Sequence, residues 1–203
     1  MFLEQCSTVA CNVEFNFSFF VMCMSSTQVV EVSKRHFKDT LATGYFDPKV
    51  TMIYDDAVQY VKDCKGVHQF DCIICDSSDP IGPAASLFTP AFYTSMRDVL
   101  SPGGVITTQG ECQWLYLDLI ANVVQTCCGI FDCARYAYAS VPSYPSGQIG
   151  FIVCSNDSSI DGSVPLRQPS SSMELQYYSP EMHQASFVLP VFAAKSLPQK
   201  KSS

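Results

Sequence analysis

Two aspartates stand three residues apart within DCIICDSSDPIGPAASLF, residues 71–88. Asp76 and Asp79 follow an apolar run of strand length and precede the chain bend that the PIGP residues set. A carboxylate can take a proton from a reacting group, and two neighbouring carboxylates cost energy unless a cationic partner joins them. The spacing therefore predicts a site for a cationic ligand at the end of a buried strand.

Other polar residues stand in similar positions along the chain. Hydrophobic patterns, caps and glycines predict strands at 15–24, 49–54, 70–75 and 105–108 and near 131–140 and 148–154, with helices at 27–43, 57–64, 90–100 and 114–127. Strands that alternate with helices are typical of an α/β fold with a mostly parallel sheet, where ligands bind outside the carboxyl ends of the strands. The polar residues that directly follow predicted strands are Asp56, Asp76, Asp79, Gln109 and Glu111. Each alone could be a helix cap or a solvated loop residue, but their convergence at one edge indicates a cationic ligand.

Composition limits the remaining classes of function. The chain has 203 residues, 47% of them hydrophobic, which suits one globular domain, and its net charge of -7 argues against a nucleic-acid backbone as partner. Eleven scattered cysteines do not form a disulfide framework, so reduced thiols are expected. Cys72 and Cys75 would point to opposite faces of a strand, and the three histidines lie far apart in the sequence, so no metal site is predicted.

The amino-terminal residues do not have the pattern of a signal peptide. They lack a basic start, they carry Glu4 and Glu14, and the apolar run over residues 19–24 is too short for a membrane span. We therefore expect a cytoplasmic protein without a membrane partner.

Four separate motifs carry a family resemblance that extends from about Val29 to Ala194. They are DSSDPIGPAASLF, TQGECQWLYLDLI, YPSGQIGF and LQYYSPEMHQASFVLPVFA. Together they resemble the spermidine synthases, which are aminopropyltransferases of polyamine biosynthesis. The resemblance implies that putrescine attacks the propyl carbon beside the sulfonium of decarboxylated S-adenosylmethionine, giving spermidine and methylthioadenosine. It also implies no prosthetic group.

The resemblance assigns roles at the diamine end of the site. Asp76 matches the family's base, which is needed because a primary amine with a pKa near 10.4 must lose a proton before it attacks. Asp79 would hold a substrate nitrogen, and the Tyr144 hydroxyl would orient the attacking amine. Gln109 and Glu111, directly or through water, would bind the remote ammonium.

On the cofactor side, the resemblance places Asp56 and Ala57 against adenine. The loop that contains Asp76, Ser77 and Ser78 would border the sulfonium. Both substrates are cationic, so the family assignment agrees with the acidic edge that the residues alone predict.

The chain also departs from the family pattern. We expect a Rossmann-like, methyltransferase-type sheet that lacks the family's first strand, its glycine-rich loop and its amino-terminal β domain, and Met24-Ser25-Ser26 stands where the family has acids for the ribose. The predicted organisation is a divergent segment with one strand over residues 1–28, an incomplete catalytic domain over 29–196 and a disordered tail over 197–203. The missing first strand would leave two buried strands without main-chain partners.

Three interpretations therefore remain. Retained QGEC and YPSGQIG motifs favour aminopropyl transfer, impaired by the missing part, over a putrescine N-methyltransferase-like enzyme. A non-catalytic interaction or regulatory fragment of the same family is the alternative. A homodimer, or an association with a full-length paralogue, is compatible with each of them.

Overall fold

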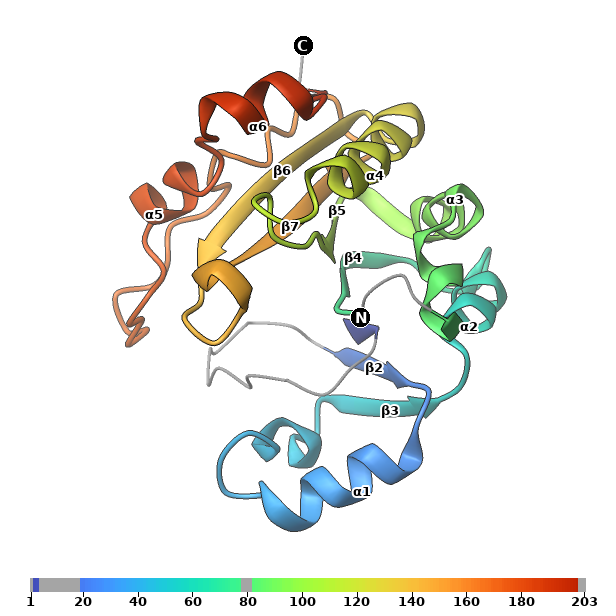
Figure 1. Ribbon diagram of the computed structural model, residues 1–203. Helices are drawn as coiled ribbons and strands as arrows, with labels where there is room; N and C mark the ends of the chain where they lie inside the picture. Colours follow the sequence, from blue (N-terminus) through green and yellow to red (C-terminus); the bar gives the residue numbers. More distant parts are fainter. Residues whose placement is uncertain (1, 4–18, 78–81, 201–203) are drawn as a thin grey trace.

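A single mixed sheet forms the centre of the protein, whose computed structural model describes residues 2–3, 19–77 and 82–200 (Figure 1). Its strands lie in the order β3-β2-β1-β4-β5-β7-β6. Strands β1 to β5 are parallel to one another, and β7 runs antiparallel to both β5 and β6. The strands are β1 (Phe2–Leu3), β2 (Phe20–Met24), β3 (Val50–Tyr54), β4 (Phe70–Cys75), β5 (Leu100–Gln109), β6 (Cys133–Ser140) and β7 (Gln148–Ser155).

Helices cover both faces of this sheet. The α-helices are α1 (Thr27–His36), α2 (Ala57–Cys64), α3 (Pro90–Asp98), α4 (Leu117–Ile130), α5 (Pro180–Ala185) and α6 (Val191–Ser196), and short 3-10 helices span Thr43–Phe46, Gly82–Phe88 and Pro145–Gly147. Alternation along β2 shows how the faces divide: Val21 and Cys23 join the large core, whereas Met22 and Met24 pack with Val30 of α1 on the other face.

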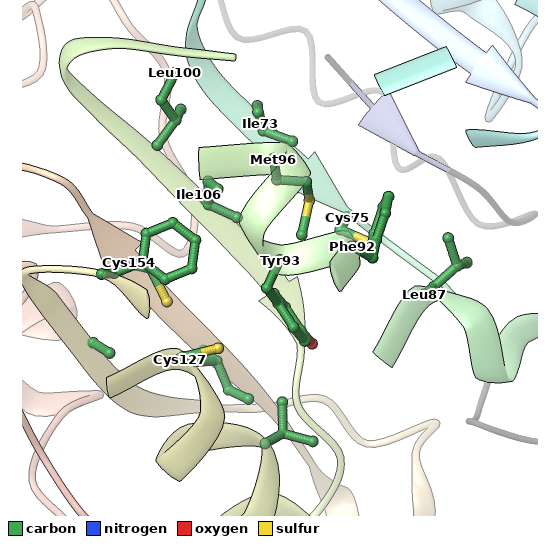
Figure 2. Close-up of a cluster of buried hydrophobic side chains, with 14 of the residues drawn as sticks. Ile73, Cys75, Leu87, Phe92, Tyr93, Met96, Leu100, Ile106, Cys127 and Cys154 are labelled. Carbon is green, nitrogen blue, oxygen red and sulfur yellow. The ribbon is translucent and has the colours of Figure 1, made fainter. Parts of the chain in front are cut away.

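The large core lies between the sheet and helices α2, α3 and α4. Phe92, Tyr93 and Met96 of α3 are fully buried against Ile73 of β4 and Ile106 of β5 (Figure 2). These apolar side chains fix α3 across the central strands.

Elements with clear terminal signals match the sequence predictions. The predicted bounds of α2 and β4 are confirmed, as is the start of α3, where Thr89 accepts a hydrogen bond from Phe92 N at 3.3 Å and Pro90 occupies the first turn. No disulfide joins any two of the nine cysteines that the structure describes.

The first predicted helix is too long, because α1 ends at His36 instead of Thr43. The Phe37 carbonyl accepts main-chain hydrogen bonds from Thr40 at 3.0 Å and from Ala42 at 2.9 Å, which turns the chain. The Thr40 hydroxyl also reaches the Phe37 carbonyl, and such local side-chain bonds compete with a continuing helix. Gly44 consequently lies in a 3-10 turn and not at a helix end.

Two later boundaries are also wrong. The SPGG run does not end a helix before a short strand; α3 stops at Asp98, and β5 already begins at Leu100, which pairs with Phe70 of β4 before a register shift. Gly104 permits this close approach, because a Cβ there would lie 2.9 Å from the Ser101 carbonyl oxygen. Helix α4 starts at Leu117, three residues later than expected, which leaves Trp114 exposed.

The central position of the sheet was expected to be vacant, but β1 occupies it. Phe2 and Leu3 pair in parallel with Met22 and Cys23 of β2 on one side and with β4 on the other. Strand β1 has only two residues and is shorter than β2 and β4 on either side of it, so it fills only part of the space between these two strands. A cavity of about 80 Å³ lies where β1 does not reach, at the amino ends of β2 and β4; its lining is Phe19, Phe20, Val21, Gln69, Phe70, Asp71, Cys72 and Ile74.

The carboxyl-terminal segment is more ordered than predicted. The disordered tail was expected from residue 197, but Leu197 is buried and Lys200 forms a bridge with Ala134 on the edge strand β6. The Lys200 ammonium also donates to the Phe131 carbonyl at 2.8 Å. These contacts hold residues 197–200 against the sheet, because they bury an apolar side chain and pair main-chain groups of an edge strand.

Candidate active site

The predicted site residues that the structure describes lie at one edge of the sheet. Register places the carboxyl ends of the parallel strands together: Met24 opposite Tyr54, and Cys75 opposite Thr108. The loop between β6 and β7 reaches the same edge, because β7 is antiparallel to β5. The end of β4, the end of β5 and the β6–β7 loop are therefore neighbours, whereas the end of β3 lies three strand positions from β4, or roughly 14 Å at about 4.8 Å per strand.

Asp76 directly follows β4 and is half-buried. Burial raises the pKa of its carboxyl from 3.8 to about 6, because water that would solvate the charged form is excluded. At pH 7 about nine-tenths of these carboxyls are still ionised. Asp76 is thus a stronger base than an exposed aspartate and yet remains available to accept a proton.

Ser77 lies beside Asp76 and is buried, with its hydroxyl oxygen unpartnered within the described residues. Ser78 and Asp79 lie outside those residues, so their predicted roles remain predictions. A buried polar atom without a partner costs about 1–3 kcal/mol, so a group outside the described residues is expected to complete its hydrogen bonding.

The end of β5 supplies two further predicted residues. Gln109 is the last residue of β5, and its side-chain oxygen is buried and unpartnered within the described part of the chain. Glu111 has φ of 53°, a left-handed conformation that is unusual for a residue with a side chain. An amide oxygen and a carboxylate at this point can both accept hydrogen bonds from an ammonium group.

Tyr144 lies on the β6–β7 loop and has 39% of its surface exposed. Its main chain closes two turns, because its N–H donates to Val141 O at 3.0 Å and its carbonyl accepts from Gly147 N at 2.9 Å. Its side chain is therefore presented on a defined loop at the same edge as Asp76 and Glu111.

Asp56 caps helix α2, and this structural role uses one of its carboxylate oxygens. That oxygen accepts from Val58 N at 2.7 Å and from Gln59 N at 3.4 Å, while the residue as a whole is exposed. Ala57, the first residue of α2, is buried. Capping of α2 is a structural reason for an aspartate at position 56. The predicted contact of Asp56 with adenine stays a prediction.

Gln113 is a polar residue that the sequence reasoning did not single out. It is only 1% exposed, its amide nitrogen donates to the Gln148 side-chain oxygen at 3.4 Å, and its own oxygen has no partner in the described ranges. The indole of Trp114 donates to the same Gln148 oxygen at 3.1 Å. No periodic signal marks Gln113, although it belongs to the QGECQW motif; the partner that orients it is 35 residues away.

The described residues show neither a metal centre nor a membrane helix. No group of three or more His, Cys, Asp or Glu side chains within them is placed to hold a metal ion. Cys75 faces the large core together with Ile73, whereas Cys72 does not, as the strand alternation predicts. None of the helices in residues 19–77 and 82–200 has the length and apolar character that a membrane crossing requires.

The strand order, with parallel strands followed by an antiparallel pair, defines a Rossmann-like, methyltransferase-type α/β protein. A solved structure of human methyltransferase-like protein 13 shares this fold, with a TM-score of 0.53 at 16% identity. Two solved spermidine synthases are more similar. One is bound to the transition state analogue AdoDATO and has a TM-score of 0.79 at 28% identity; the other, from Thermotoga maritima, has 0.74 at 26%.

The sequence comparisons establish the family. Residues 13–163 match the spermine/spermidine synthase domain. The spermidine synthases of Dictyostelium discoideum and Schizosaccharomyces pombe are each 43% identical, over 176 and 186 residues that cover 87% and 90% of this chain. The chain belongs to the spermine/spermidine synthase family. It spans 61% of the length of these two relatives, and 61% of the solved AdoDATO complex.

Proposed function

We propose that the chain carries a spermidine synthase-type site that transfers an aminopropyl group from decarboxylated S-adenosylmethionine to putrescine. The nitrogen lone pair of the diamine forms a bond to the propyl carbon, and the bond from that carbon to sulfur breaks. The electron pair goes to sulfur, which leaves as neutral methylthioadenosine, and the product is spermidine. The attacking ammonium must lose its proton before it can react, and Asp76 takes it.

The observation that carries this proposal is the half-buried carboxyl of Asp76 directly after the carboxyl end of β4, with its pKa raised to about 6. A general base works best when its pKa lies near the working pH. Ser77 and Gln109 support the assignment, because each has a buried oxygen that is unpartnered in the described residues and can bind a substrate N–H. Both substrates are cationic, which suits an edge that presents carboxylates and amide oxygens.

The individual roles proposed are those that the family resemblance implies. Gln109 at the end of β5 and Glu111, two residues later, bind the remote ammonium of putrescine, and Tyr144 orients the attacking amine. Asp79 holds a substrate nitrogen. On the cofactor, the Asp76-Ser77-Ser78 loop borders the sulfonium, while Asp56 and Ala57 meet adenine about three strands away, a separation that an extended adenosyl group can bridge. No prosthetic group is required.

The domain organisation follows the same proposal. Residues 29–196 form a partial catalytic domain, preceded by a divergent segment over residues 1–28. The protein acts in the cytoplasm, and a homodimer or an association with a full-length paralogue supplies the remaining part of the site.

A second candidate, a non-catalytic interaction or regulatory fragment, is favoured by one observation. Strand β1 has only two residues at the centre of the sheet, and the chain spans 61% of its relatives' length. If the part of the relatives that this chain does not span holds the ribose and aminopropyl groups, the cofactor loses two or three hydrogen bonds of about 1.5–3 kcal/mol each, or roughly 10³-fold or more in affinity. We therefore expect the chain alone to turn over slowly.

The test is release of methylthioadenosine from decarboxylated S-adenosylmethionine and putrescine. The 203-residue chain is compared with a version extended at its amino end by the corresponding region of the Schizosaccharomyces pombe spermidine synthase. We expect the extended version to be at least about tenfold faster, and Asp76→Asn to lower its turnover about 10²-fold or more.

The turnover measurements distinguish aminopropyl transfer, a non-catalytic fragment and methyl transfer. Turnover of the short chain within about tenfold of the extended version would contradict the expected impairment. An extended version that is inactive would favour the non-catalytic fragment. Supplying S-adenosylmethionine instead, and finding a methylated diamine, would indicate methyl transfer.

A further inference from the structure

Glu111 has a backbone conformation that needs an external restraint. Its φ of 53° lies in the left-handed region, where the Cβ of an ordinary residue crowds the following carbonyl at a free-energy cost. Glu111 and Ser146 are the non-glycine residues with positive φ in the described part of the chain, and both are at the candidate edge. Such strain persists only when surrounding contacts determine the conformation.

Tyr136 of β6 provides that contact. Its side chain is fully buried, and its hydroxyl donates a hydrogen bond to the main-chain carbonyl of Glu111 at 2.9 Å. Burial raises the pKa of the Tyr136 hydroxyl above its usual value, so the hydroxyl keeps its proton throughout the physiological pH range. The bond crosses β7, which lies between β5 and β6, and it fixes the peptide that follows Glu111.

Gly150 of β7 makes this arrangement possible. A Cβ on Gly150 would overlap the Tyr136 hydroxyl and would lie 2.5 Å from the Glu111 carbonyl oxygen. Gly150 also accepts a hydrogen bond from the Gly110 N–H at 2.8 Å, which ties the residue before Glu111 to the same strand. The backbone on both sides of Glu111 is therefore held, by Gly150 before it and by Tyr136 after it.

We propose that Tyr136 is a positioning residue for the diamine end of the site: its hydrogen bond, in the space that Gly150 leaves, sets the direction in which the Glu111 side chain departs from the backbone. This inference rests on the proposed function, in which the Glu111 carboxylate binds the remote ammonium of putrescine. Tyr136 itself touches no substrate. It acts by keeping Glu111 in a conformation that the residue would otherwise leave.

The experiment measures two dissociation constants on the 203-residue chain by amide NMR titration, one for putrescine and one for methylthioadenosine. Tyr136→Phe should raise the putrescine Kd about fivefold, the effect of one neutral hydrogen bond, and change the methylthioadenosine Kd less than about twofold. A purely structural loss would weaken both ligands. Sucrose in all samples favours the folded state, so a destabilised variant remains measurable.

Four further variants complete the design. Tyr138→Phe removes a hydroxyl two residues along the same strand, on the same face, and should leave both constants unchanged. p-Aminophenylalanine at position 136 keeps a donor there and should restore putrescine binding. Glu111→Gln should weaken putrescine about tenfold in the parent but less than about twofold in the Tyr136→Phe background, because the carboxylate is no longer in place.

The outcomes distinguish this inference from the proposal beneath it. If Glu111→Gln leaves putrescine binding unchanged, the diamine role of Glu111 fails and the positioning role fails with it. If Glu111→Gln weakens binding but Tyr136→Phe does not, only the positioning role is overturned. Equal losses for both ligands in Tyr136→Phe would also overturn it.

Discussion

Replacing Asp76 with asparagine should stabilise the fold while it removes the proposed base. The folded-state pKa of Asp76, about 6, lies above the ordinary value of 3.8. The folded chain therefore holds an extra proton between about pH 3.8 and 6, so its stability falls as the pH rises through this window and stays constant above it. At higher pH the fold keeps a carboxylate charge that burial disfavours, and asparagine has no such charge.

The magnitude follows from the shift. A difference of about 2.2 units, at 1.36 kcal/mol per unit, corresponds to at most about 3 kcal/mol at pH 8. At pH 5 the folded carboxyl is mostly protonated, and the same relation gives about half that free energy. Asp76→Asn should therefore raise the free energy of unfolding at both pH values, by roughly twice as much at pH 8 as at pH 5.

Urea unfolding of the parent and the variant at pH 5 and pH 8 measures these differences, provided that the m value is unchanged. Asp71→Asn is the matched control, because Asp71 is an exposed aspartate on the same strand, and its substitution should change stability by less than about 0.5 kcal/mol. The reasoning is refuted if Asp76→Asn is no more stable than the parent at pH 8. A gain of equal size at both pH values would show that packing, and not charge burial, causes it.

Three other substitutions test how the sheet holds its surroundings, each by urea unfolding. Arg135→Met should cost about 3 kcal/mol, because the buried guanidinium pairs with Asp161 and lies 5.1 Å from the centre of the Phe187 ring; a variant as stable as the parent would show that the carboxyl-terminal segment is held without it. Ser155→Ala should cost about 1–3 kcal/mol, since the buried hydroxyl donates to the Gly104 carbonyl at 2.8 Å, and a neutral result would mean that this carbonyl finds another donor. Thr89→Ala should cost about 1 kcal/mol as the lost cap of α3, whereas Thr89→Ser should cost much less; equal losses would argue against capping.

The sequence predicted best those elements whose limits are set by neighbouring residues. Helix α2 starts at the Asp56 cap, and β4 is an apolar run that ends at two acids, so both were predicted with their correct bounds. The start of β5 could not be found in this way. The local turn signal of SPGG is overridden by pairing between Leu100 and Phe70, 30 residues apart, which the sequence does not reveal.

The same distinction between local patterns and long-range contacts applies to the residues of the candidate site. Asp76, Gln109 and Glu111 were predicted as site residues because ligands bind beyond the carboxyl ends of parallel strands, a rule that needs only the strand limits. Gln113 and Tyr136 were not identified, because their importance depends on contacts with Gln148 and Glu111 that span 35 and 25 residues. Nor could the sequence show that Glu111 has a positive φ, since a glutamate gives no local signal for that conformation.

Burial of Asp76 connects the stability of the fold with the chemistry proposed for it. An exposed aspartate of pKa 3.8 that accepts a proton from an amine of pKa near 10.4 faces a gap of about 6.6 units, or roughly 9 kcal/mol. With a pKa of about 6 the gap is about 4.4 units, or roughly 6 kcal/mol, so burial removes at most about 3 kcal/mol, reduced by solvent screening at this half-buried carboxyl, from the cost of forming the neutral nucleophile. This is the same free energy by which the ionised carboxylate destabilises the empty fold at pH 8, because both quantities come from one pKa shift. A cationic ligand that binds beside Asp76 relieves that destabilisation, because a positive charge favours the carboxylate and lowers its pKa. Desolvation of the amine next to the sulfonium acts on the other partner, since burial and a neighbouring positive charge both lower the pKa of an ammonium.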